Sequence, residues 1–512
     1  MFPYLIMKPL QIKDKKLTEY GDVTIYRGFP QNFYELKEEK FSEQEVEIAE
    51  SLIKFFKKEK GFGEIEKRLN KIAKELREIF EIILSKELII NLSKQKDYEN
   101  IFAKLSNALK KFGIKNYSKL AKHIIDNSIG FGVLKKMMED KNLEEIMVNP
   151  EGNVFIFHRE FGVCKTNLKL DENFLEILLK RVSNYANRPF DDMHPLLDAR
   201  LPDKSRINAT HKYITNGYAI TIRKFLPNPY SIVSLIENNT MSPELAAFLW
   251  VCVEGLNMDP QNIICTGGAG SGKTTTLNAL TSFINLKERI ITIEDTLELN
   301  LVGRENWIQM EAKLPIHGKE ITMDDLLKNA LRMRPDRIIV GEVRGKEAET
   351  LFVAMDIGHR GCLGTLHANT AREMLIRLKN HPMNVPEQML PLLNLILVHN
   401  RIYHPEKGLI RRISQVAEVS RMGEKVLLSN LFEWDYKKDE IKRNDVPSEI
   451  LQQLSYKTGL SVKAIMNEIE VRKRILEWML ENNIKSHEDV LKTIQSYYYD
   501  PDSLLKKISK LS

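Results

Sequence analysis

The apolar residues of segment 63–83 recur alternately four and three positions apart, a spacing that places them on one stripe of a helix. These positions are Ile65, Leu69, Ile72, Leu76, Ile79 and Ile83. The run is short for a free coiled coil, so we expect the helix to pack within a bundle. This pattern predicts a helical N-terminal region over residues 1–140.

A different pattern begins near residue 145. Two β-rich runs within residues 145–162 flank an Asn-Pro-Glu-Gly turn, which is typical of a hairpin. A helix is predicted over residues 174–186, and apolar and polar side chains alternate over residues 219–223 as on a half-buried strand. These elements predict an α+β domain over residues 141–225.

The remaining chain divides into three parts. Three prolines and several Asn and Ser residues in segment 226–243 are typical of an interdomain linker. Over residues 244–420, apolar strand-like runs alternate with helical patterns, which indicates a parallel α/β sheet. Residues 421–512 return to an amphipathic helical pattern, so we expect a helical C-terminal region.

The composition bounds the class of protein. A chain of 512 residues is too long for one hydrophobic core, and 43% hydrophobic with 29% charged residues is typical of a soluble globular protein. The net charge of +6 is mild for a protein built to bind nucleic acid. The longest apolar runs, such as residues 245–253, fall well short of the roughly 20 residues of a membrane-spanning helix. The start of the chain lacks the long apolar region of a signal peptide.

The four cysteines are scattered and include no CxxC pair, which is consistent with a reducing cytosol rather than a zinc site or a disulfide framework. They are Cys164, Cys252, Cys265 and Cys362. We therefore expect a cytoplasmic protein that lies at the inner face of the cell membrane only through partners.

A glycine-rich loop follows an apolar strand and precedes a helical run, and reads Gly267-x4-Gly272-Lys273-Thr274. This order is the context that a phosphate-binding P-loop requires. Backbone N–H groups would cradle the β-phosphate, Lys273 would reach the β- and γ-oxygens, and the Thr274 hydroxyl would bind Mg²⁺. The predicted ligands are ATP and Mg²⁺, and the predicted nucleotide-binding residues are Gly267, Gly268, Ala269, Gly270, Ser271, Gly272, Lys273, Thr274 and Thr275.

Three further blocks place polar groups after predicted strands, where ligands bind in a parallel sheet. Residues 289–299 form a strand that ends in the acids Glu294, Asp295 and Glu298. The strand of residues 337–345, RIIVGEVRG, has Gly341 where the common P-loop pattern has Asp, and its acid follows as Glu342. His367 ends the strand of block 358–370, where it could sense the γ-phosphate. Arg332 and Arg334 come just before the strand of residues 337–345. They are as consistent with interacting with the dipole at a helix C-terminus as with a function.

These four blocks, in this order, resemble the secretion or traffic ATPases of type II secretion, type IV pili and type IV secretion. The blocks are GGAGSGKT, ITIEDTLEL, RIIVGEVRG and GHRGCLGTLHANT, and the resemblance covers roughly residues 130–400. The chain looks most similar to the archaeal branch that powers archaella and archaeal pili, since PLLDARLPDKSRINAT (195–210) is similar to that branch's N-domain motif. The resemblance implies an α/β fold with a RecA-like P-loop ATPase core, an α+β N-terminal domain and a helical N-terminal extension.

The resemblance also implies roles for individual residues. Glu298 matches the family's general base, and Glu342 matches its Walker B acid on the Mg²⁺ side, although the division of labour between the two acids stays open. The family is hexameric, and Arg206 and Arg223 match N-domain arginines that approach the phosphates. The implied catalytic set is Lys273, Glu298, Glu342, His367, Arg206 and Arg223, with Thr274 and Glu342 on the metal.

The function implied is an ATPase motor that drives assembly or rotation of a filament through a polytopic membrane platform protein, with accessory cytosolic motor subunits as further partners. An archaellum, an adhesive pilus and a secretion pseudopilus stay open. The rival is a RecA-like nucleic-acid translocase or recombinase, whose basic path would run along residues 115–123 or 471–478. Residues 421–512 hold 16 basic and 15 acidic residues, so no nucleic acid is expected as a partner.

Overall fold

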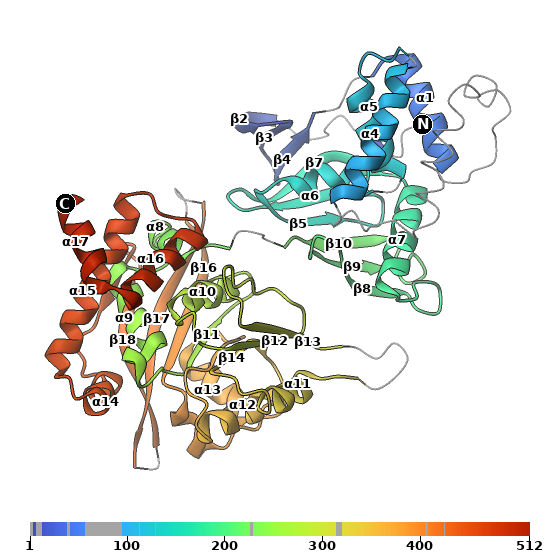
Figure 1. Cartoon of the computed structure of the whole chain (residues 1–512). Helices are drawn as coiled ribbons and strands as arrows, with labels where there is room; N and C mark the ends of the chain where they lie inside the picture. The colour runs from blue at the N-terminus through green and yellow to red at the C-terminus, as the bar shows by residue number, and fades with distance from the viewer. Residues whose placement is uncertain are drawn as a thin grey trace. The chain divides into compact units, whose positions relative to one another are not determined.

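In a computed structural model, the chain divides into two compact units, residues 1–226 and 227–512 (Figure 1). The structure describes residues 4–6, 13–37, 41–56, 95–111, 113–128, 130–225, 229–313, 320–404, 408–423 and 425–511. The predicted helix over residues 63–83 lies outside these ranges. Each unit is described by itself below.

The first unit is built on a ten-stranded sheet in the order β2-β3-β4-β7-β6-β5-β10-β9-β8, with β1 paired to β7. Most neighbouring strands are antiparallel, whereas β4 and β7 are parallel. The strands are β1 (Tyr4–Ile6), β2 (Lys13–Tyr20), β3 (Val23–Gly28), β4 (Asn32–Leu36), β5 (Leu143–Val148), β6 (Asn153–His158), β7 (Gly162–Leu170), β8 (Leu196–Arg200), β9 (Arg206–Thr210) and β10 (Ala219–Arg223).

The prediction of an all-helical segment over residues 1–140 is wrong for its beginning, because β1–β4 lie within residues 4–36. The hairpin β2–β3 turns at Gly21 and Asp22, and Tyr20 pairs with Val23 across it. A Gly-Asp turn is a hairpin signal when β-rich runs flank it. Here the run before the turn, KDKKLTEY, is polar and gives no strand pattern. The four strands extend the sheet of the α+β region instead of forming a separate bundle.

The helices of the first unit are α1 (Glu43–Phe56), α4 (Gln95–Lys111), α5 (Tyr117–Ser128), α6 (Leu134–Glu139) and α7 (Glu172–Ala186). Helices α1, α4 and α5 share one apolar cluster, whereas α6, α7 and the sheet share another. The predicted hairpin is confirmed as β5–β6, and the helix predicted over residues 174–186 is confirmed as α7.

The second unit contains a nine-stranded sheet in the order β13-β12-β14-β15-β11-β16-β17-β18-β19. Neighbours from β13 to β16 are parallel, and those from β16 to β19 are antiparallel. The strands are β11 (Ile263–Gly267), β12 (Ile290–Glu294), β13 (Trp307–Glu311), β14 (Arg337–Val343), β15 (Leu363–Leu366), β16 (Leu395–His404), β17 (Gly408–Met422), β18 (Lys425–Asp435) and β19 (Glu440–Arg443).

Helices cover both faces of this sheet and bury its apolar strands. One apolar cluster joins α8, α9, α10 and α14–α16 to the sheet, and a second joins α11, α12 and α13 to the opposite face (Figure 1). The helices are α8 (Ile232–Glu237), α9 (Pro243–Glu254), α10 (Lys273–Leu280), α11 (Met323–Ala330), α12 (Glu347–Asp356), α13 (Ala371–Lys379), α14 (Glu449–Thr458), α15 (Val462–Glu481), α16 (His487–Tyr499) and α17 (Pro501–Leu511), with 3-10 turns at Gly255–Asn257, Thr281–Phe283 and Glu387–Leu392. This sheet, parallel from β13 to β16 and covered by helices on both faces, confirms the predicted α/β core.

Two predicted boundaries are corrected. The described part of the expected linker 226–243 contains α8, and apolar residues such as Ile232 and Met241 are buried in the core. Prolines and polar residues suggested a linker, but Ser231 caps α8 and the Ile-Val-x-Leu-Ile run supplies its buried face. The C-terminal part begins as antiparallel strands β17–β19, and helices take over only from α14 onward.

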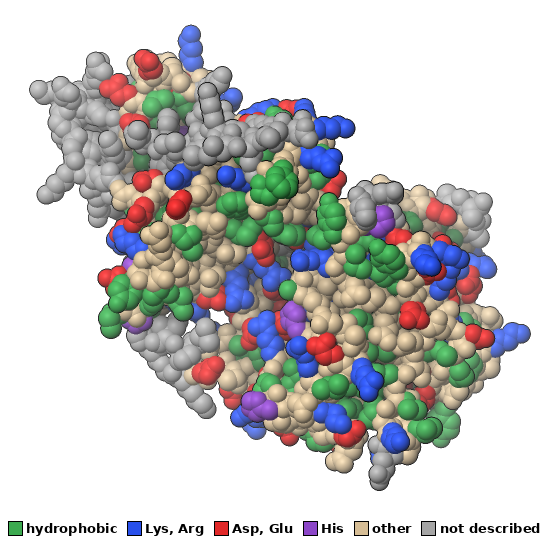
Figure 2. Space-filling model, turned by 180° about the vertical axis from the view of Figure 1, so that it is seen from behind, with side chains coloured by type: hydrophobic (Ala, Val, Ile, Leu, Met, Phe, Trp, Pro, Cys, Tyr) green, Lys and Arg blue, Asp and Glu red, His purple; other side chains and the backbone are tan. Residues whose placement is uncertain are grey.

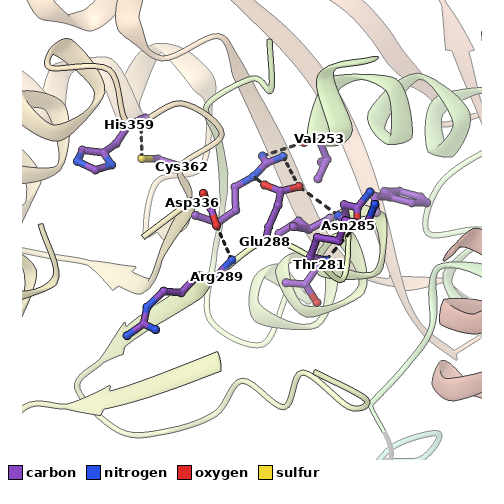
Figure 3. A network of polar contacts seen from close by, with 12 residues as sticks. Val253, Thr281, Asn285, Glu288, Arg289, Asp336, His359 and Cys362 are labelled. Carbon is purple, nitrogen blue, oxygen red and sulfur yellow. Dashed lines mark hydrogen bonds and ion pairs between the residues drawn. The ribbon is translucent and has the colours of Figure 1, made fainter. Parts of the chain in front are cut away.

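A buried polar network lies at the amino edge of this sheet (Figure 3). Arg337, the first residue of β14, pairs with Glu288 and donates a hydrogen bond to the Val253 carbonyl. Beside it, the Arg289 N–H donates to the exposed Asp336 carboxylate at 2.7 Å. This edge is opposite to the carboxyl ends of the strands, so the network supports the sheet and takes no part in the site described next.

Among the residues that the structure describes, no helix has the length and apolarity that crossing a bilayer requires.

Candidate nucleotide site

A strand, a glycine-rich loop and a helix follow one another within the second unit's sheet. β11 ends at Gly267 and α10 begins at Lys273, so residues 268–272 form the loop between them. Gly267, Gly270 and Gly272 have φ angles of 147°, 66° and 100°, in the left-handed region that favours glycine. This is the arrangement in which N–H groups at a helix N-terminus surround a phosphate.

The loop is also packed too closely for a larger residue at Gly267. A Cβ atom on Gly267 would lie 2.3 Å from the His399 carbonyl oxygen of β16, and one on Gly270 would lie 2.8 Å from Arg401 Nη1. Arg411, the cross-strand partner of Arg401 in the β16–β17 pair, donates a 2.9 Å hydrogen bond from Nε to the Gly270 carbonyl. The β16–β17 hairpin therefore holds the glycine-rich loop in place through Arg411 and adds positive charge beside it.

Lys273 is buried at the start of α10, and its ammonium group bonds back onto the loop. Its Nζ donates 3.0 Å hydrogen bonds to the carbonyl oxygens of Gly267 and Gly268. The same Nζ lies 3.4 Å from His367 Nδ1. The predicted lysine and histidine are thus neighbours, although they are 94 positions apart in the chain.

A connected group of charged side chains runs along the carboxyl edge of β12, β14 and β15. Arg344 pairs with Glu342 and lies 3.3 Å from Asp295, and His367 Nε2 lies 2.9 Å from Glu342 Oε1. Burial acts to raise the pKa of Glu342, but the Arg344 hydrogen bond and the charges of Arg344, His367 and Lys273 outweigh it and lower that pKa. Burial and the Lys273 charge lower the pKa of His367. The site therefore favours an ionised glutamate beside a neutral imidazole.

The strand β14 is irregular where it carries its acid. Its pairing with β15 shifts register between Val340 and Val343, so Gly341 and Glu342 stand in a bulge, a feature that often re-aims a side chain. The space beside Gly341 is filled, because a Cβ atom there would lie 2.7 Å from Cγ of Glu294. The departure from the usual Asp at this position thus has a steric cause: the neighbouring strand supplies a carboxylate side chain to the same place.

Glu298 lies on the loop after β12, and its half-buried side chain is near the charged group just described. Its charge, together with the larger influence of Glu342 and Asp295, helps to raise the pKa of Arg344. The structure therefore brings Lys273, Glu298, Glu342 and His367 to one edge of the sheet. Their catalytic roles stay predictions.

The two predicted arginines lie in the first unit and form a cross-strand pair, Arg206 on β9 with Arg223 on β10. Arg206 also makes a two-point ion pair with Asp198, with Nε 3.0 Å from Oδ1. Because the two units are described separately, an approach of these arginines to a nucleotide stays a prediction.

The residues predicted to hold Mg²⁺ fit that ion only together with a nucleotide. Thr274 is the second residue of α10, and Glu342 is the ionised acid at the edge. Within the described ranges, no group of three or more His, Cys, Asp or Glu residues could hold a metal. Mg²⁺ takes one or two protein ligands and otherwise uses phosphate oxygens and water, so this sparse set suits it.

Sequence reasoning missed Arg344, Arg401 and Arg411 and gave Glu294 no separate role. Arg344 stands two positions after Glu342 in the quoted block, and alternation along the strand would have placed both side chains on one side. Nothing in the sequence indicates that Arg401 and Arg411 reach the loop, because that contact depends on the pairing of β16 with β11.

The strand, the glycine loop and the helix that begins at Lys273 together have the geometry of a phosphate-binding loop. The sequence model of the family described as Type II/IV secretion system protein matches residues 127–418, and the chain belongs to this family. The resemblance drawn from the four sequence blocks is thereby confirmed.

Individual relatives span several organisms. The chain is 31% identical to the uncharacterized protein MJ0781 of Methanocaldococcus jannaschii, over 74% of this chain and 76% of that protein. It is also 31% identical to the conjugal transfer protein TrbB of Rhizobium radiobacter, over 49% of this chain and 76% of TrbB. Among solved structures, the VirB11 ATPase of the Brucella suis type IV secretion system, in complex with sulphate, is 26% identical, with coverage of 56% and 92% and a TM-score of 0.29.

Proposed function

We propose that the protein is a Mg²⁺-dependent ATPase that works as the motor of a type II/IV secretion-like or pilus-like machine. The observation that carries the proposal is the connected set of polar side chains from Glu342 through His367 to Lys273 beside the glycine loop. Phosphoryl transfer depends mainly on positioning and on charge stabilisation, and such a set supplies both.

Each residue has a defined part in the proposed reaction. Lys273 leaves the two loop carbonyls and binds the β- and γ-oxygens of ATP. Glu298 orients and deprotonates the attacking water, and the neutral His367 donates a hydrogen bond to the γ-phosphate. Thr274 and Glu342 would hold Mg²⁺, which would supply positive charge against the phosphate oxygens. The guanidinium groups of Arg206 and Arg223 come from a neighbouring copy and stabilise the equatorial oxygens.

The working assembly in this proposal is a homo-hexamer with a polytopic membrane platform protein as its partner. Membership of a secretion-system family supports the membrane partner. The choice of an archaellum or archaeal pilus as the driven filament rests on the resemblance of residues 195–210 to the archaeal branch. Accessory cytosolic motor subunits and a location at the inner face of the membrane belong to the same proposal.

The rival function, translocation of nucleic acid, has less support. Arg472 belongs to the basic segment 471–478, but it is buried and paired with Glu254 and Glu468 instead of facing a strand of DNA. On the face seen in Figure 2, positive and negative side chains are intermixed and form no continuous basic path.

The first experiment compares steady-state ATP hydrolysis by the full chain and by Lys273→Ala, with Lys287→Ala as a matched control. Lys287 lies in the turn before β12, at the amino edge of the sheet, so its loss should leave turnover unchanged. We expect Lys273→Ala to lose at least about 10²-fold in turnover. Equal rates in all three proteins would overturn the proposed activity.

The second experiment adds single-stranded DNA or vesicles of anionic lipid to the same assay. Stimulation by vesicles is expected of a motor that works at a membrane, whereas stimulation by DNA alone would favour the translocase. Deleting the gene and scoring swimming and surface filaments separately then distinguishes an archaellum from an adhesive pilus.

A further inference from the structure

Glu294 is the last residue of β12, and none of the roles proposed above uses it. Its side chain is 2% exposed, which is rare for a carboxylate that makes no ion pair with a buried cation. Two features of its surroundings account for its position: the backbone of the loop that follows, and a glycine on the next strand.

The first feature is a clamp on the loop that carries Glu298. One oxygen of Glu294, Oε2, accepts hydrogen bonds from the N–H groups of Glu298 at 2.7 Å and Leu299 at 2.9 Å. The loop after β12 has no helix or strand before β13, so these N–H groups have no ladder partner. A single buried oxygen therefore fixes the backbone at the residue that is proposed to activate water.

The second feature is the fit against β14. The Cγ and Oε2 atoms of Glu294 would lie 2.7 Å and 3.3 Å from a Cβ atom on Gly341. Gly341 does not have a positive φ, so the space and not the backbone conformation requires glycine there. Thr365 of β15 donates a 2.6 Å hydrogen bond to the Gly341 carbonyl and holds this strand in place. The side chain of Glu294 is thus confined between its own loop and a fixed strand.

We propose that Glu294 is a positioning residue, whose oxygen Oε2 sets the place of Glu298 relative to the attacking water. This inference rests on the proposed ATPase function. It also explains why a glycine precedes the acid of β14: Glu298 can be held from β12 only if position 341 has no side chain.

The charge state is consistent with this role. The other oxygen, Oε1, is buried and has no hydrogen-bond partner within the described part of the chain. Burial raises the pKa of Glu294 to about 7. The hydrogen bonds from the Glu298 and Leu299 N–H groups oppose this rise, and the charges of Glu298 and Glu311 add to it. A neutral carboxyl still accepts both N–H groups through its carbonyl oxygen, so the clamp holds in either protonation state of Glu294.

The test compares Glu294→Met with Glu294→Gln in the full chain. Methionine keeps the length and the buried volume but accepts no hydrogen bond of this strength, whereas glutamine keeps a carbonyl oxygen in the same place. Asp336→Ala is the matched control, because Asp336 also accepts a backbone N–H through its carboxylate, but at the opposite edge of the sheet (Figure 3).

The expected result is selective. Glu294→Met lowers kcat by roughly 10²-fold with KM changed by less than about 3-fold, because a small displacement of the base affects chemistry more than binding. Glu294→Gln stays within about 3-fold of the wild type in kcat, as does the control. Equal losses in the Met and Gln variants, or an unchanged kcat in Glu294→Met, would overturn the inference.

Hydrogen exchange separates this inference from the proposed function. The amides of Glu298 and Leu299 should be protected in the wild type and in Glu294→Gln, and exchange faster by at least about 10-fold in Glu294→Met. Protection that persists in Glu294→Met rules out the clamp, whatever the activity. A wild type that protects these amides but does not hydrolyse ATP would instead reject the ATPase proposal and leave the clamp supported.

Discussion

The buried carboxyl of Glu294 makes the stability of the second unit depend on pH, and replacing it with a group that does not titrate should remove that contribution. Its pKa is raised from 4.5 to about 7, and this difference corresponds to roughly 3 kcal/mol at about 1.36 kcal/mol per pKa unit. Because the folded form holds the proton more tightly than the unfolded chain, stability falls as pH rises from 4.5 to about 7. Below pH 4.5 the carboxyl is neutral in both the folded and the unfolded state, so its burial does not lower the stability through ionisation.

Glu294→Gln removes this titration and keeps the accepting oxygen. Its free energy of unfolding relative to the wild type should therefore increase by roughly 2–3 kcal/mol between pH 5 and pH 8. Urea unfolding followed by tryptophan fluorescence reports the second unit alone, because all four tryptophans, Trp250, Trp307, Trp434 and Trp478, lie in it. Asp336→Asn removes an exposed carboxylate and serves as control. The reasoning is refuted if the curves for Glu294→Gln and the wild type run parallel from pH 5 to pH 8.

Three further predictions address other parts of the structure. Arg223→Ala should slow hydrolysis by roughly 10³-fold while nucleotide binding stays near normal, and a wild-type rate in a turnover assay would remove the proposed role. Gly341→Ala should destabilise the second unit by about 1–3 kcal/mol in urea unfolding, because the added methyl group overlaps Glu294, and no change would contradict the packing described. Arg472→Met should lower the free energy of unfolding by about 3–5 kcal/mol, because it leaves the buried Glu254 carboxylate without its cation. Adding Glu254→Gln should recover part of that stability. A double variant no more stable than the single one in urea unfolding would argue against the pair.

The residues at the carboxyl edge of the second unit's sheet could be predicted from the sequence, because each block there is local. Glycine spacing fixes the loop, and acids or a histidine placed directly after apolar runs come to the carboxyl edge of any parallel sheet. The structure accordingly places Lys273, Glu342 and His367 together. The contact of Glu294 with Gly341 could not be predicted, because it depends on the pairing of β12 with β14, whose first residues are 47 positions apart.

The errors in the fold have related causes. The strand β2 is mostly polar, so its extended conformation depends on pairing with β3 and not on its own residues. Segment 229–243 contains the turn-forming residues of a linker, yet tertiary packing buries its apolar positions under the core. In both places, contacts with other segments of the chain decided the structure over local composition.

The central claim is that Glu298 and Glu342 act on the terminal phosphate of a nucleotide held by the glycine loop. The most direct test is a crystal structure of the full chain with Mg²⁺ and a non-hydrolysable ATP analogue. The account predicts Lys273 Nζ on the β- and γ-oxygens and off the Gly267 and Gly268 carbonyls, with both glutamates within reach of the γ-phosphate through Mg²⁺ or a water. A nucleotide bound elsewhere, or both glutamates far from its γ-phosphate, would contradict it.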